Sequence, residues 1–144
     1  MDTIGSDHSP APPEMKTGAN FFRVWGGISG AQHTLSLLLT EAQNHGAALP
    51  PISNMLSRNV AERFSLPGTK GRIEVGCDAD LALVDLMSEF EVRTEDLFYR
   101  HRQTPYASRR LRGQVARTLL HGRTIFRDGK FVATPAGRLL KPQR

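Results

Sequence analysis

The stretch Asp7-His8-Ser9-Pro10 places a carboxylate, an imidazole and a hydroxyl next to one another near the start of the sequence. We interpret residues 2–6 as a short strand that ends at Asp7. A carboxylate at the carboxyl end of a strand lies where α/β enzymes place their catalytic groups. There it can bind a cation or accept a proton from a bound water. By residue type alone, however, a turn or N-cap aspartate is the commoner role.

The histidines do not complete a metal site in this sequence. On a strand, His8 and Asp7 would point to opposite faces, so the two cannot act as a clamp on one ion. The other histidines show no His-x-His or His-x-x-x-His spacing, and we do not interpret them as ligands. They are His33, His45, His101 and His121. The sequence also shows no nucleophile elbow, P-loop or dinucleotide fingerprint.

A second candidate for chemistry is the glycine-rich stretch FFRVWGGISG. Trp25 precedes Gly26 and Gly27, and Gly30 follows shortly after. Glycines let the backbone come close to a ligand, but they also suit a sharp turn into a helix. Both interpretations stay open on the residues alone.

Two helices are expected after this stretch. Between Ala31 and His45, apolar residues recur at spacings of three and four, and Gly46 is a plausible C-cap. The next helix is expected over residues 51–64. The prolines at its start are compatible with a helix, because the N–H that a proline lacks would have no helical partner in the first turn.

The pattern then changes to strands. The stretch RIEVGCDADLALVDL predicts two strands around a turn at residues 76–80, and residues 90–92 are a further candidate. Residues 118–120 and 124–126 flank a glycine turn, and Asp128-Gly129 is a strong second turn signal. The chain is therefore expected to be helical in its first half and β-rich in its second.

Composition narrows the class of protein. The 144 residues carry a formal net charge of +5, but the basic residues form no run with interleaved aromatic residues, so nucleic-acid binding is disfavoured. Cys77 is the only cysteine, which excludes an internal disulfide and a thiolate zinc cluster. No signal peptide or membrane-spanning run is visible, and a cytoplasmic location is expected.

Several motifs together resemble a known family. "SDHSP" with "PPEMK" and then "WGGISGAQ" are similar to the allantoinases of the cyclic amidohydrolase group. The likeness continues in order through "KGRIEVGCDADLALVD", "YRHRQTPYASRRLRG" and "VARTLLHGRTIFRDGKF". The first motifs favour allantoinase over hydantoinases, dihydropyrimidinases and dihydroorotases, whereas the G-x-DADL element indicates only the superfamily.

The resemblance implies an α/β family fold, a TIM-barrel amidohydrolase with a small β-sandwich. This chain would hold the last barrel strand and helix followed by part of the sandwich, so it is α+β in itself. Residues 1–66 would be the C-terminal end of the (β/α)8 barrel, and residues 67–144 a partial β-sandwich domain. Leu35, Leu38 and Leu39 would then pack on barrel strands that this sequence does not contain.

The resemblance also implies an activity, the hydrolytic opening of the hydantoin ring of allantoin to allantoate. Asp7 would match the late aspartate that binds metal and acts as the general base. Ser9, Trp25, Gly26 and Gly27 would border the substrate. The complete enzyme would carry two zinc ions. The resemblance implies that the other metal ligands of the family are a His-x-His pair, a carboxylated lysine and two further histidines. Because this sequence contains none of these ligands, we expect this chain by itself to be inactive and to bind no zinc pair.

Other classes of function remain open for this chain. The chain could be a non-catalytic β-rich module or a partner subunit of an amidohydrolase, or part of a hydantoinase- or dihydropyrimidinase-like hydrolase. Its expected partners are allantoin or a similar cyclic ureide and a chain that supplies the missing barrel, or further copies of itself. No nucleic acid or membrane partner is expected.

Overall fold

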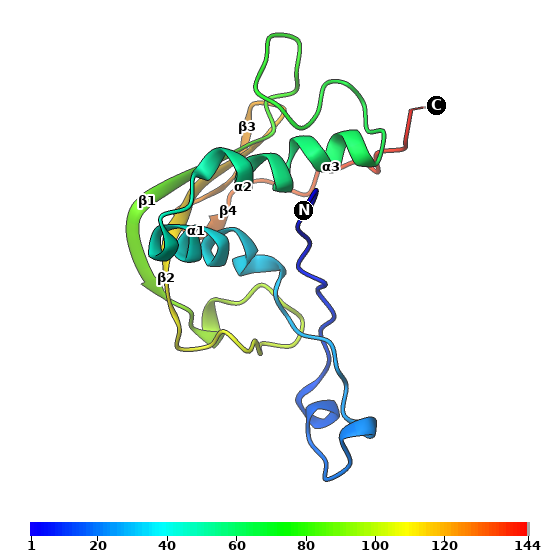
Figure 1. Ribbon diagram of the computed structural model, residues 1–144, viewed down its shortest axis with the longest axis vertical. Coiled ribbons are helices and arrows are strands. Elements are labelled where there is room, and N and C mark those ends of the chain that lie inside the picture. Colours follow the sequence, from blue (N-terminus) through cyan, green and yellow to red (C-terminus); the bar gives the residue numbers. More distant parts are fainter. Residues whose placement is uncertain (144) are drawn as a thin grey trace.

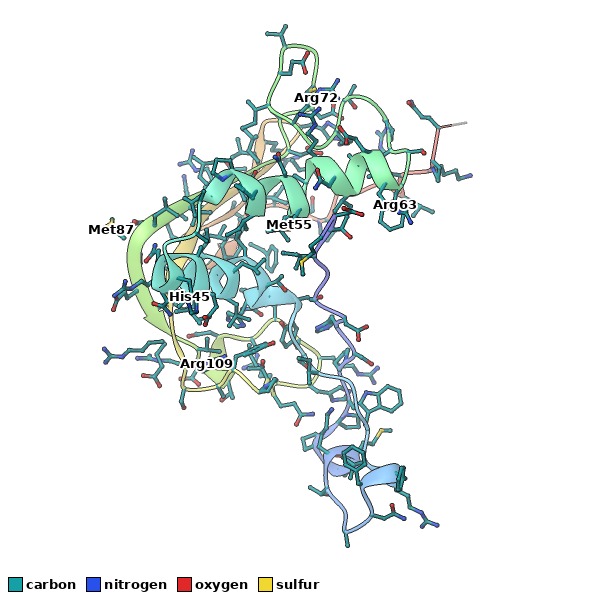
Figure 2. All side chains as sticks on the ribbon, in the orientation of Figure 1. His45, Met55, Arg63, Arg72, Met87 and Arg109 are labelled. Carbon is teal, nitrogen blue, oxygen red and sulfur yellow. The ribbon has the colours of Figure 1, made fainter. Side chains whose placement is uncertain are left out.

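The computed structural model describes residues 1–143, which form a four-stranded sheet, three α-helices and a long N-terminal arm. The helices are α1 (Thr34–His45), α2 (Leu49–Leu56) and α3 (Arg58–Arg63). The strands are β1 (Leu81–Glu91), β2 (Arg110–Leu120), β3 (Arg123–Arg127) and β4 (Lys130–Phe131). Short 3-10 turns are η1 (Pro13–Lys16), η2 (Phe21–Arg23), η3 (Ala31–His33) and η4 (Thr94–Asp96). The arm with η1 and η2 extends away from the sheet (Figure 1).

The sheet is antiparallel throughout, in the order β1-β2-β3-β4. Two-residue turns at His121-Gly122 and Asp128-Gly129 join β2 to β3 and β3 to β4. All four turn residues have positive φ angles, between 48° and 77°, as type I′ hairpin turns require. The predicted hairpins are therefore confirmed.

Helix α1 packs against β2 at the position of Gly113. Leu39 is 5% exposed, and a Cβ on Gly113 would lie 2.6 Å from its Cδ1 atom. The Ser36 hydroxyl donates to the Gly113 carbonyl at 2.6 Å. The expectation that Leu39 packs on barrel strands outside this sequence is wrong, because β2 provides the surface that buries it.

The helices follow the prediction with one interruption. Residues 31–45 form η3 and α1, and Gly46 ends α1 in the left-handed conformation with φ 65°. The second predicted helix begins earlier, at Leu49, and is divided into α2 and α3 at Ser57, whose φ and ψ are −131° and −78°. The Ser57 side chain makes no capping hydrogen bond, and α3 begins at the next residue. Among the helices of residues 1–143, none has both the length and the apolar character of a membrane span.

Two predicted strands are absent from residues 1–143. Residues 72–75 form turns and irregular structure, with Ile73 and Val75 almost fully exposed at 89% and 103%. Residues 2–6 also belong to no strand, and the one nearby bridge pairs His8 with Ile28. A strand requires a neighbouring strand for its backbone hydrogen bonds, and alternation in sequence cannot supply one. The candidate strand at residues 90–92 is largely the end of β1.

The G-x-DADL element has a structural role here. Asp78 accepts hydrogen bonds from Lys70 at 2.9 Å and from the Thr69 hydroxyl at 2.9 Å. The hydrogen bond from Lys70 is the main reason that the pKa of Asp78 lies below its usual range. Asp80 accepts from the backbone N–H of His121 at 2.7 Å. The element thus ties the loop before β1 to the β2–β3 turn.

Candidate functional site

Two segments of the N-terminal arm lie against each other and bring three of the predicted site residues together. The Ser9 N–H donates to the Ile28 carbonyl at 2.8 Å, and the Trp25 indole N–H donates to the Ser9 carbonyl at 3.2 Å. At Gly27 the segments approach so closely that a Cβ would lie 2.3 Å from the Ser9 Cβ. Ser9, Trp25 and Gly27 therefore form one cluster, in the arm that projects from the sheet (Figure 1).

The other two predicted site residues border this cluster. Gly26 has open space around it, since a Cβ there would meet nothing within 4 Å. Asp7 lies two residues before Ser9, is exposed, and adopts a left-handed backbone with φ 45°. Asp7 is thus on a bent connection and not at the end of a strand, contrary to the local prediction. Among residues 1–143, its carboxylate makes no hydrogen bond or ion pair.

His8 has a role that its position beside Asp7 did not indicate. Its Nδ1 atom accepts hydrogen bonds from the N–H groups of Gly30 and Ala31 at 3.2 and 3.3 Å. Its ring lies 4.7 Å from that of Tyr99, whose hydroxyl accepts from the Gln32 N–H at 2.6 Å. Burial is the main reason that the pKa of Tyr99 lies above its usual range. His8 therefore fastens the Asp7 segment to the beginning of η3.

The loop between β1 and β2 supports both segments of the arm. The Thr104 hydroxyl donates to the carbonyl of Ser29 at 2.7 Å, and the Gln103 side chain donates to the carbonyl of Ala11. These partners are 75 and 92 residues apart in sequence. No spacing rule connects such residues, so sequence reasoning had no signal for them.

Lys16 is another residue that the sequence did not single out. Its ammonium group donates to the carbonyl of Trp25 at 2.8 Å and also to the carbonyl of Gly27. It therefore contacts the backbone on both sides of Gly26. Lys16 lies ten residues before Gly26, and a lysine at that spacing from a glycine pair matches no known site motif.

We expect Gly27→Ala to separate the two segments of the arm. The new Cβ would collide with both the Cβ and the carbonyl oxygen of Ser9, at 2.3 and 2.7 Å. Overpacking of this kind destabilises by about 1–3 kcal/mol, so the segments should open roughly tenfold more often. Trypsin cleavage after Arg23, followed by mass spectrometry, should accelerate by about that factor.

Gly26→Ala is the matched control for this substitution, because a Cβ at Gly26 meets nothing within 4 Å. Its cleavage rate should equal that of the unsubstituted chain. Equal rates for Gly27→Ala and Gly26→Ala would contradict the close approach of Gly27 to Ser9.

Comparison with known proteins places the whole arrangement in a family. The model of the amidohydrolase family matches residues 1–129. The chain belongs to the amidohydrolase family. The family resemblance inferred from the motifs is thereby confirmed.

The curated amidohydrolase relatives include several allantoinases. The chain is 55% identical to an allantoinase of Rubrobacter xylanophilus, over 98% of this chain and 31% of the relative. It is 49% identical to one of Deinococcus radiodurans, over 99% of this chain and 32% of the relative. An allantoinase of Salmonella newport is 40% identical over 100% of this chain and 32% of its own length. The chain thus spans about a third of the length of these relatives.

Solved structures of hydantoinases share the fold of this amidohydrolase chain. A D-hydantoinase (dihydropyrimidinase) from Thermus sp. superposes with a TM-score of 0.86 at 26% identity, covering 93% of this chain and 30% of that one. An L-hydantoinase (dihydropyrimidinase) from Arthrobacter aurescens gives a TM-score of 0.87 at 26% identity, with 92% and 30% coverage. The arrangement of sheet, helices and arm is therefore one that occurs within larger hydantoinase chains.

Proposed function

We propose that this chain is the C-terminal part of an allantoinase-type cyclic amide hydrolase, which opens the hydantoin ring of allantoin or a similar cyclic ureide. The observation that carries the proposal is the identity with allantoinases along nearly the whole chain. In this proposal residues 1–66 complete a (β/α)8 barrel, and residues 67–144 form part of a β-sandwich.

The arm supports the assignment of the site. Asp7 offers a carboxylate that is exposed and, among residues 1–143, makes no hydrogen bond or ion pair, so it is available to a proton or a metal ion. Ser9 lies two residues after Asp7, and its contacts with Trp25 and Gly27 bring these residues into the same part of the arm. The N–H of Gly26, which lies between them, has no hydrogen-bond partner among residues 1–143. A cyclic ureide presents alternating N–H and C=O groups, which peptide groups can pair with directly. We therefore assign Asp7 as the catalytic base and the other four residues as the substrate border.

Zinc is the metal that we expect in the complete enzyme, but the residues of this chain do not make up a zinc site by themselves. Asp7 is a single carboxylate, and among residues 1–143 no three His, Cys, Asp or Glu side chains gather in a way that could hold an ion. A zinc ion usually takes three or four protein ligands. Asp7 can thus contribute at most one ligand of a site completed by another part of the enzyme.

The sheet supports the proposal that residues 67–144 are an incomplete sandwich. An open groove of about 860 Å³ runs between the N-terminal end of α1 and the sheet. Its apolar lining includes three phenylalanine rings with centroids 4.8 to 6.1 Å apart, of which Phe98 and Phe131 remain 53% and 64% exposed. The buried Nδ1 atom of His33 faces no hydrogen-bond partner among residues 1–143. A second sheet laid on this groove would bury the rings and could supply that partner.

We expect the isolated chain to show no zinc-dependent release of allantoate, because one carboxylate cannot hold the metal pair. Its uncovered phenylalanines each forgo about 2 kcal/mol of burial, so we also expect self-association or low stability. Mixing it with the remaining part of an allantoinase relative should restore hydrolysis. Sedimentation, thermal unfolding and allantoate release should be measured on both samples.

The outcomes separate the candidate functions. If the mixture hydrolyses allantoin faster than hydantoin and dihydrouracil, the result supports an allantoinase. The reverse order of rates supports the hydantoinase-like alternative that the solved structures suggest. A stable complex with no hydrolysis of any ring would support a non-catalytic partner subunit. Zinc-dependent hydrolysis by the isolated chain would refute the proposal that further ligands are required.

A further inference from the structure

We propose that Lys16 is a positioning residue that fixes the backbone of the Trp25–Gly27 segment, so that the Gly26 N–H is presented to a carbonyl oxygen of the substrate. The consequence for substrate rests on the proposed function, but the positioning itself does not. Lys16 sits in η1, and it reaches across to a segment nine to eleven residues further along the chain.

Lys16 contacts the Trp25–Gly27 segment from one side. An ammonium group has three donors, and two of them go to the carbonyls of Trp25 and Gly27, the first at 2.8 Å. The neighbouring Met15 carbonyl accepts the Trp25 N–H at 2.8 Å. Residues 15 and 16 therefore hold the segment before and after Gly26, while a Cβ on Gly26 itself would meet nothing within 4 Å.

The geometry of the peptide group fixes the direction of the Gly26 N–H. The structure contains no cis peptide bond, and in a planar trans peptide the N–H points opposite to the C=O of the same unit. Because the Trp25 carbonyl points to Lys16, the Gly26 N–H points away from it. Among residues 1–143, this N–H donates to no other group. The result is an oriented, unused donor one residue before Gly27, which lies against Ser9, and two residues before Ile28, which pairs with the segment that follows Asp7.

Without the ammonium group, the two carbonyls would lose their shared partner. The glycine pair would then sample other backbone conformations readily, because glycine has few steric limits. The Gly26 donor would no longer be preorganised, and substrate binding would have to order it. Lys16 would therefore affect the affinity for substrate more than the rate of the chemical step.

Trp25 provides a direct test, because it is the only tryptophan of the chain. We would compare Lys16→Met, which keeps the apolar stem and removes the donors, with Lys16→Arg, which keeps donors. Lys130→Met is the control, since Lys130 is an exposed lysine on β4. The measurements are the emission maximum and acrylamide quenching of the chain, with far-UV circular dichroism to monitor the fold.

Lys16→Met should shift the Trp25 emission to the red and raise the quenching constant about twofold, since Trp25 is now 43% exposed. Lys16→Arg should lie between Lys16→Met and the unsubstituted chain, and Lys130→Met should match the latter. The positioning role is overturned if Lys16→Met leaves the spectrum unchanged, if Lys16→Arg equals Lys16→Met, or if the unsubstituted spectrum already equals that of the urea-unfolded chain.

A second arm tests the consequence for substrate in the enzyme complemented with the remaining part of an allantoinase relative. Lys16→Met should raise KM about tenfold, the effect of one lost oriented hydrogen bond, and leave kcat near its original value. A lower kcat with unchanged KM would overturn the presentation of Gly26 to substrate. If the unsubstituted complemented enzyme is inactive, the proposed function fails, and the fluorescence arm still decides the role of Lys16.

Discussion

Asp7→Asn should lower the turnover of the complemented enzyme by at least about a hundredfold while leaving the fold intact. An asparagine amide cannot accept a proton at neutral pH and is a weaker metal ligand than a carboxylate. The fold should not respond, because the Asp7 side chain is exposed and makes no hydrogen bond or ion pair among residues 1–143. Asparagine also tolerates the left-handed backbone at φ 45° as well as aspartate does.

The control for this prediction is Asp128→Asn. Asp128 is likewise exposed and left-handed, with φ 50°, but it lies in the β3–β4 turn. Its substitution changes the same charge in the same backbone conformation, so turnover should stay unchanged. Substantial residual turnover of Asp7→Asn, or an equal loss in Asp128→Asn, would remove Asp7 from the catalytic role.

We expect Gly113→Ala to lower the free energy of unfolding of the chain, because Gly113 is the glycine within the strands β1–β4. Gly113 has φ 78°, which costs an alanine about 1–2 kcal/mol. The added Cβ would lie 2.6 Å from the Leu39 Cδ1 and 3.1 Å from its Cβ, which adds about 1–3 kcal/mol of overpacking. The urea midpoint, followed by circular dichroism, should fall because α1 can no longer pack closely on β2.

Gly137→Ala serves as the control, since a Cβ there meets nothing within 4 Å and the backbone is not left-handed. Its urea midpoint should equal that of the unsubstituted chain. If Gly113→Ala shows the same midpoint, then α1 does not depend on its contact with β2, and the arrangement of helix and sheet described above is wrong at that point.

The amino-acid sequence by itself determined the features that depend on near neighbours. The spacing of Leu35, Leu38 and Ala42 predicted the helix that α1 forms, and Gly46 ends it as expected. Asp128-Gly129 predicted a hairpin turn because both positions require positive φ, which these residues adopt most readily. The motifs around Asp7 and Trp25 also indicated the family. Each of these signals lies within a few residues, where backbone preference and side-chain period act directly.

Only the tertiary structure decided which distant groups meet. Residues 2–6 form no strand, because no neighbouring strand pairs with them among residues 1–143. Leu39 is buried by β2, and the residue of β2 that it contacts, Gly113, lies far along the chain. Position 113 leaves no room for a Cβ because of that contact. Likewise the carbonyl partners of Lys16 depend on how the arm folds back on itself. Such contacts are fixed by packing and hydrogen bonding in space, and sequence spacing carries no record of them.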